Sequence, residues 1–187
     1  RAPGVASTSG DWGVVMRTGI VVAITIGFVP SAGSSDAARP TLPAVVTADL
    51  QAVAAECVEV GGKALTDEAI KRADLNGDGK EDYVLDVGAI QCDGAASIYG
   101  DRSKKVTVYV GDGAGGAVEA FSDMSYGIRF EGKGIATKLW LTVLGEECGK
   151  KPAVDFASEK FCDRSLVWQG ATNKFEFAPV STVKMIE

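Results

Sequence analysis

The chain contains no histidine. This absence excludes the Ser-His-Asp and Cys-His arrangements of nucleophilic catalysis, because both use an imidazole as the base. It also excludes a histidine-ligated zinc site and a pH switch that depends on the charge of histidine. The commonest catalytic and zinc-binding arrangements are therefore removed at once.

Positive charge is also scarce. The 19 Lys and Arg residues are outnumbered by 25 Asp and Glu residues, which gives a formal net charge of -6 and a pI near 4.8. The basic residues cluster no further than short pairs such as Lys104-Lys105 and Lys150-Lys151. We therefore expect no nucleic-acid partner.

No apolar run near the N-terminus is long enough to cross a bilayer. Residues 19–29 form an uncharged run of eleven residues, whereas a membrane span needs about 20. Met16 and Arg17 precede this run and the small-residue stretch PSAGSSDAA follows it, which is the order of a signal peptide. We expect residues 16–37 to be a signal peptide, and we interpret residues 1–15 as upstream sequence read in frame or a cloning remnant. The mature protein is then periplasmic or secreted, without a stable membrane span.

The four cysteines lack the C-x-x-C spacing of zinc and thioredoxin-type sites. An even number of cysteines in an exported chain favours two disulfides over four buried free thiols. Three pairings are possible, and we favour Cys57 with Cys92 and Cys148 with Cys162, because the nearest pairs close the shortest loops.

A length of 187 residues, with 46% hydrophobic and 24% charged residues, is typical of one globular domain. Residues 43–57 place Val46, Leu50, Val53 and Cys57 on one face of a helix, and glycines at 61 and 62 end it. After this segment the hydrophobic period changes from helical spacing to two, which indicates strands.

Eight segments carry the period of two or a short apolar run typical of strands: 69–73, 83–87, 106–110, 117–121, 126–131, 135–143, 165–169 and 174–178. Turn-forming residues join many of them, at 76–79, 111–116, 131–134 and 170–173. The expected fold class is α+β, with one N-terminal helix packed on a mostly antiparallel β-sheet built from hairpins. Residues 38–187 are expected to form this single domain.

Residues 74–82 read DLNGDGKED and carry the most specific chemical signal in the chain. Oxygen-bearing side chains at positions 1, 3, 5 and 9 surround a glycine at position 6, the arrangement by which a loop binds calcium. Glycine is needed because the chain must turn sharply between the ligands. The alternative is a metal-free Asn-Gly-Asp-Gly turn whose acids are merely solvated.

This loop does not fit an EF-hand, because position 12 is Leu85, inside an expected strand, where an EF-hand needs a bidentate acid. It resembles the D-x-[DN]-x-D-G-x-x-D loop of FG-GAP and related repeats of integrin-type propellers, in which the loop joins two strands. The loop occurs once, so the resemblance does not imply a propeller. It implies a calcium ion held by four side chains and one backbone carbonyl, those of Asp74, Asn76, Asp78 and Asp82 and of Lys80.

A looser similarity covers residues 42–180. A helix with a cysteine near its end, DLNGDGKEDYVLD, a second cysteine, a valine-rich hairpin and then C-x13-C followed by LVWQGATNKFEF resemble a group of short exported bacterial proteins. The resemblance implies export and disulfides, and it implies no activity.

Other motifs carry weaker signals. Gly111, Gly113 and Gly116 spell G-x-G-x-x-G, but the short AVEAF segment that follows is strand-like rather than the helix a dinucleotide site needs, so we expect a hairpin turn. Carboxylates for hydrolysis are suggested only by proximity, at Glu146, Glu147 and Asp123. Trp140 is out of phase with its leucine neighbours and is expected on the sheet face opposite the helix, either as a ligand anchor or in a second layer of packing.

Three functional hypotheses follow. The leading one is an exported binding or accessory module with a structural calcium ion and a protein or glycan partner. The alternatives are an exported hydrolase that uses carboxylates and a secreted enzyme inhibitor that projects a stapled loop such as residues 148–162.

Overall fold

A computed structural model describes residues 41–100 and 102–186 of the chain. These residues belong to one compact unit, Arg39–Glu187. The predictions for residues 1–15 and for the signal peptide at 16–37 lie outside the described residues. In the part that the structure describes, no helix has the length and apolar character needed to cross a membrane.

The expected helix is confirmed as α1, Ala44–Glu59. Val46 and Cys57 are buried on its inner face, and Leu50 and Val53 are half-buried beside them. The helix ends as the sequence predicts, because Gly61 follows it with a positive φ of 82°, a conformation that glycine adopts without steric cost.

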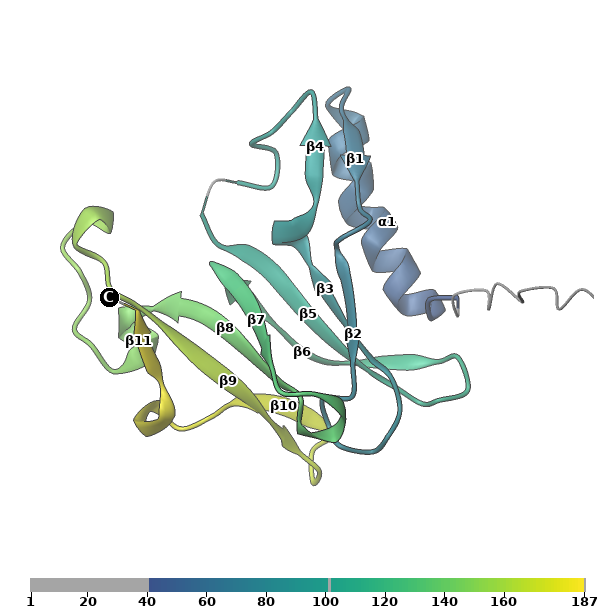
Figure 1. The fold of residues 1–187 in the computed structure, drawn as a ribbon. Helices are drawn as coiled ribbons and strands as arrows, with labels where there is room; N and C mark the ends of the chain where they lie inside the picture. Colours follow the sequence, from purple (N-terminus) through teal and green to yellow (C-terminus); the bar gives the residue numbers. More distant parts are fainter. Residues whose placement is uncertain (1–40, 101, 187) are drawn as a thin grey trace, which may run out of the picture. The chain divides into compact units, whose positions relative to one another are not determined.

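All strand pairs are antiparallel among the described residues, and they form three sheets (Figure 1). A two-stranded sheet joins β1 (Lys63–Leu65) to β4 (Gln91–Asp93). A four-stranded sheet has the order β2 (Ile70–Ala73), β3 (Asp82–Asp86), β5 (Lys104–Gly111), β6 (Ala117–Ser125). A five-stranded sheet has the order β10 (Lys174–Phe177), β9 (Phe161–Gln169), β8 (Lys138–Leu144), β7 (Gly127–Glu131), with β11 (Lys184–Ile186) also paired to β9.

The α+β prediction is confirmed, and each of the eight expected strands corresponds to one of these elements. Three strands of only three residues, β1, β4 and β11, were not predicted. The strands expected in one sheet instead form three hydrogen-bonded sheets. Alternate residues of β3 and β5 face opposite sides of the four-stranded sheet and join two different clusters.

The four-stranded sheet lies between α1 and the five-stranded sheet, so both of its faces are buried. On the helix side its residues join a cluster of Val46, Ala69, Tyr83, Leu85, Ile90 and Tyr109. On the other side its valines meet the five-stranded sheet in the larger core, made by Val84, Val106, Val108, Ala120, Leu139, Leu141, Val143, Cys148, Cys162, Leu166 and Phe175. Burial on both faces explains why residues 83–85 of β3 and 106–110 of β5 are all apolar except Thr107.

Trp140 lies on the opposite side of β8 from Leu139 and Leu141, which face this larger core. The residue is 6% exposed, and its ring is covered by the Arg129 guanidinium, 5.3 Å from the ring centroid, and by the Lys184 ammonium at 4.1 Å. Trp140 therefore packs beneath two cations rather than standing free as a ligand anchor.

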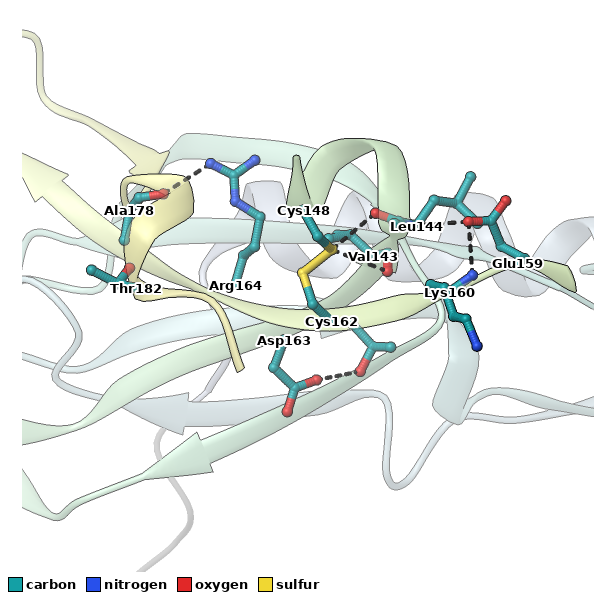
Figure 2. The surroundings of a disulfide bond; sticks show 12 residues. Val143, Leu144, Cys148, Glu159, Lys160, Cys162, Asp163, Arg164, Ala178 and Thr182 are labelled. Atoms are coloured by element: carbon teal, nitrogen blue, oxygen red, sulfur yellow. Dashed lines mark hydrogen bonds between the residues drawn. A yellow bond between two sulfur atoms is a disulfide. The ribbon is translucent and has the colours of Figure 1, made fainter. Parts of the chain in front are cut away.

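Both favoured disulfide pairings are present: Cys57–Cys92 joins α1 to β4, and Cys148–Cys162 joins the 3-10 turn Gly145–Cys148, which follows β8, to β9 (Figure 2). Gly62 lies against the first bridge, since a Cβ atom there would come within 2.5 Å of the Cys92 sulfur. Two disulfides fit an extracellular or periplasmic protein, because such compartments are oxidising.

A polar contact also fastens α1 to the four-stranded sheet. The buried Tyr109 hydroxyl on β5 donates to the Asp49 carboxylate on α1, and burial together with this bond raises the pKa of Tyr109. The hydroxyl of Tyr99 donates to the backbone carbonyl of Val53, 3.1 Å away, and makes a second tether to the helix.

Replacing Tyr109 by phenylalanine is expected to lower the free energy of unfolding by about 1–2 kcal/mol, because a bond to a charged acceptor is lost. Tyr99→Phe, which loses a bond to a neutral carbonyl, should cost less. Urea denaturation of both variants measures the difference, and a larger loss for Tyr99→Phe would contradict this ranking.

Candidate metal centre

Residues 74–81 connect β2 to β3 as a hairpin loop whose end is set by the pairing of Ala73 with Asp82. Strands on both sides confirm that the loop is not part of an EF-hand. Two of its glycines adopt positive φ, 80° at Gly77 and 79° at Gly79. The turn therefore needs glycine at the two positions where the sequence supplies it.

The outer part of the loop is organised by its own side chains. The Asp74 carboxylate accepts hydrogen bonds from the backbone N–H of Gly77 at 2.7 Å and of Gly79 at 3.0 Å. The Asn76 side-chain oxygen accepts from the Asp78 N–H at 2.9 Å, and the Asp78 carboxylate accepts from the Lys80 N–H at 2.9 Å. Alternating oxygen-bearing side chains thus stabilise successive turns of the backbone by accepting its N–H groups.

These contacts also act on the charge of Asp78. The Lys80 backbone N–H, with further contributions from the Asn76 side chain and the Lys80 ammonium, holds the pKa of the Asp78 carboxyl below its ordinary value. The carboxylate is therefore ionised at neutral pH, the form that a hard cation requires.

Asp82 plays a different part, because its side chain is fully buried at 0% exposure. One carboxylate oxygen accepts from the N–H groups of Leu75 at 2.8 Å and Asn76 at 3.3 Å, and the other accepts from the Gly111 N–H at 3.1 Å. Burial raises the pKa of Asp82, while the three N–H donors favour its ionised form and oppose that shift. Asp82 thus ties the start of the loop to the end of β5.

Gly111 is the position that makes this tie possible. A Cβ atom there would lie 2.1 Å from the Glu81 carbonyl oxygen, so only glycine lets β5 approach the loop this closely. The sequence indicated Asp82 as a metal ligand, but no spacing rule indicated its contact with a residue 29 positions away.

The donor chemistry of the loop fits calcium. Asp74, Asn76, Asp78 and Asp82 offer only hard oxygen ligands, and an oxygen that accepts one N–H keeps a second lone pair. Across residues 41–100 and 102–186, no three His, Cys, Asp or Glu side chains are grouped so that they could hold a metal ion. The oxygens of the loop are instead engaged with backbone N–H groups, and the buried Asp82 is the most firmly engaged of them.

The loop borders a groove of about 390 Å³ on the protein surface. Its lining combines the loop with an apolar floor and two further turns, from Asn76, Asp78, Lys80, Val110, Gly111, Asp112, Val118, Ala120, Trp168 and Asn173. Leu75 of the same loop packs against the larger core. The loop therefore contacts both the groove and the interface between the two large sheets.

The G-x-G-x-x-G sequence forms the turn between β5 and β6, as expected. Asp112 organises it by accepting from the N–H groups of Ala114 at 2.7 Å and Gly116 at 2.9 Å. The segment that follows is strand β6 rather than a helix, so the turn lacks the helix N-terminus that holds a dinucleotide.

The acidic residues suggested for hydrolysis are brought near one another but are exposed. Glu147 is exposed but partly shielded from water by its neighbours; this partial desolvation first, and then the neighbouring charge of Asp123, raise the pKa of Glu147, whereas Arg164 opposes the shift. Glu146, Glu147 and Asp123 all lie at the surface. An exposed group of acids lacks the enclosed, water-poor setting that makes paired carboxylates effective catalysts.

Comparisons of the chain with models of protein families, with curated proteins and with solved structures found no match.

Proposed function

We propose that this chain is an exported calcium-binding module, in which a structural calcium ion holds the 74–82 loop and thereby shapes the adjoining groove for a protein or glycan partner. The observation that carries the proposal is the loop itself, which has hard oxygen ligands at positions 1, 3, 5 and 9 of a glycine-dependent turn between two strands.

The proposed ligands are the side chains of Asp74, Asn76, Asp78 and Asp82 and the backbone carbonyl of Lys80. Three carboxylates against a divalent cation leave a formal charge of -1. Extracellular calcium modules typically have dissociation constants of about 10⁻⁴ to 10⁻³ M. At such an affinity the ion stabilises the loop continuously instead of acting as a signal.

The proposal of a binding role comes from the position of the loop. Asn76, Asp78 and Lys80 line the groove beside Trp168, so an ion that fixes these side chains also fixes one wall of the groove. A rigid wall lowers the entropy that must be lost when a partner binds.

Calcium is expected to stabilise the protein measurably. At 10 mM calcium and a dissociation constant of about 10⁻⁴ to 10⁻³ M, the gain is about 1.4–2.7 kcal/mol, or about 3–10 °C in melting temperature for a domain of this size. Thermal unfolding of the full chain in calcium and in EDTA measures this difference.

The matched pair of variants is Asp78→Ala, within the ligand set, and Asp112→Ala, in the neighbouring β5–β6 turn. Asp78→Ala should abolish the difference between calcium and EDTA, whereas Asp112→Ala should retain it. Melting curves of the unsubstituted chain that coincide in calcium and EDTA would refute the calcium proposal.

A further inference from the structure

The groove beside the 74–82 loop is lined by segments that are far apart in the sequence. Its floor comes from the four-stranded sheet, through Val110, Val118 and Ala120. The five-stranded sheet contributes Trp168 on β9 and Asn173 in the β9–β10 turn. The groove volume of about 390 Å³ lies in the range of about 300–1,000 Å³ that is typical of small-molecule sites. The groove therefore has room for a small ligand or for one unit of a larger one.

The two sheets are fastened to each other beside this groove. The Lys174 ammonium on β10 donates to the backbone carbonyl of Glu119 on β6, 2.8 Å away. The rings of Phe121 on β6 and Phe177 on β10 pack edge to face, with centroids 5.4 Å apart. Both contacts join the strands that carry the floor and the wall, so the groove is shaped before a ligand binds. Such preorganisation lowers the entropy cost of binding.

Trp168 is the aromatic residue of the groove. Its ring is half-buried and packs against Phe175, with ring centroids 5.0 Å apart, which fixes the orientation of the indole. In the part of the chain that the structure describes, the Trp168 Nε1–H has no hydrogen-bond acceptor. Trp168 thus presents an apolar ring and an unused hydrogen-bond donor to the same groove.

Asn173 adds an amide at the same place. It adopts a positive φ of 53° in the β9–β10 turn, a conformation that asparagine tolerates better than most residues. Its side chain is exposed, and among residues 41–100 and 102–186 it has no hydrogen-bond partner. The amide therefore offers a ligand both a donor and an acceptor.

The charges of the lining restrict the chemistry of the ligand. The carboxylates of Asp78 and Asp112 disfavour an anion, whereas the Lys80 ammonium, 3.6 Å from the Asp78 carboxylate, disfavours a cation. A purely apolar ligand would remove the polar side chains from water without replacing their hydrogen bonds. A neutral ligand with several hydroxyl groups avoids all three costs, because hydroxyls donate to carboxylates and accept from N–H groups.

We propose that the groove binds a neutral sugar unit of a glycan. One face of the sugar ring would pack on Trp168, because the face of an indole is electron-rich and attracts polarised C–H groups. The sugar hydroxyls would bond to the Asn173 amide and the Asp112 carboxylate. This inference rests on the proposed function, in which calcium fixes the loop that borders the groove, and it goes further by naming the class of ligand.

The test is binding of the full, oxidised chain in 10 mM calcium to a glycan microarray. The array carries neutral glycans that end in glucose, galactose, mannose or N-acetylglucosamine, together with sialylated, sulfated and de-N-acetylated glycans. We expect binding to neutral glycans alone. Calorimetric titration with the neutral oligosaccharide that binds best then gives the affinities of the variants.

Asn173→Gly is the most informative variant, because glycine retains the positive φ of the turn and only the amide is lost. It should weaken binding about 3–10-fold, the effect of losing a hydrogen bond. Trp168→Leu, which keeps an apolar side chain against Phe175, should weaken binding about tenfold. Thr172→Ala is the matched control, because Thr172 is exposed in the same turn but does not line the groove; its affinity should be unchanged.

The melting temperature in calcium and in EDTA, measured on the same samples, separates this inference from the calcium proposal. A chain that is stabilised by calcium but binds no neutral glycan would overturn the sugar site alone. Stronger binding to sialylated, sulfated or de-N-acetylated glycans would also overturn it, as would full affinity in both Asn173→Gly and Trp168→Leu. Melting curves that coincide in calcium and EDTA would refute the calcium proposal instead.

Discussion

Asp82→Ala is expected to lower the free energy of unfolding by about 3–5 kcal/mol, a large share of the about 5–15 kcal/mol that a domain typically has. The carboxylate is fully buried and accepts from the N–H groups of Leu75, Asn76 and Gly111. Its removal leaves these donors without an acceptor, and each buried unsatisfied group costs about 1–3 kcal/mol. Guanidinium denaturation in EDTA measures the loss in the absence of calcium.

Asp112→Ala is the matched control, because Asp112 also accepts two backbone N–H groups but is exposed. Water replaces the lost acceptor there, so we expect a much smaller loss than for Asp82→Ala. Asp82→Asn, which retains one acceptor oxygen, should lie between the two alanine variants. Equal losses for Asp82→Ala and Asp112→Ala would show that Asp82 does not anchor the loop.

The second large effect is expected on removal of the disulfides. Cys57 and Cys92 are 35 positions apart and Cys148 and Cys162 are 14 apart. From these loop lengths, the chain-entropy treatment gives a loss of about 3.8 kcal/mol for Cys57→Ser/Cys92→Ser and about 3.0 kcal/mol for Cys148→Ser/Cys162→Ser. Guanidinium denaturation of both double variants measures the two losses.

Reduction of the unsubstituted chain should cost more than either double variant alone, because both bridges are then lost. If a double variant does not fold in buffer, unfolding in a stabilising osmolyte still ranks the two bridges. Unchanged denaturation midpoints in both variants would contradict the account of the fold as a domain stabilised by its disulfides.

Local patterns were sufficient to predict much of this fold. The spacing of Val46, Leu50, Val53 and Cys57 identified α1, and the period of two identified the longer strands, because each pattern reports directly which side chains are buried. The disulfide pairing followed from loop length. The strands β1, β4 and β11 were missed because three residues are too few to establish a period.

Contacts between distant segments could not be predicted from local sequence patterns. The tie between Asp82 and Gly111, the stacking of the four-stranded sheet between two layers, and the cover of Arg129 and Lys184 over Trp140 all join residues far apart in the sequence. Such contacts depend on how whole elements pack, and a single sequence carries no spacing signal for them.

The candidate calcium site was predictable in its residues but not in its present hydrogen bonding. Alternating oxygen side chains serve two purposes in such a loop, because the same oxygens can accept backbone N–H groups or coordinate a cation. The Asp74 and Asp78 carboxylates are engaged in the first of these in the structure. The sequence motif alone therefore does not distinguish a calcium-binding loop from a turn that is held by its own hydrogen bonds.

Equilibrium dialysis of the full chain against labelled calcium shows directly whether residues 74–82 bind the ion. We expect one bound ion per chain at a dissociation constant of about 10⁻⁴ to 10⁻³ M, lost in Asp78→Ala and retained in Asp112→Ala. No binding above that of Asp78→Ala, at calcium concentrations up to 10 mM, would refute calcium binding and identify residues 74–82 as a metal-free turn.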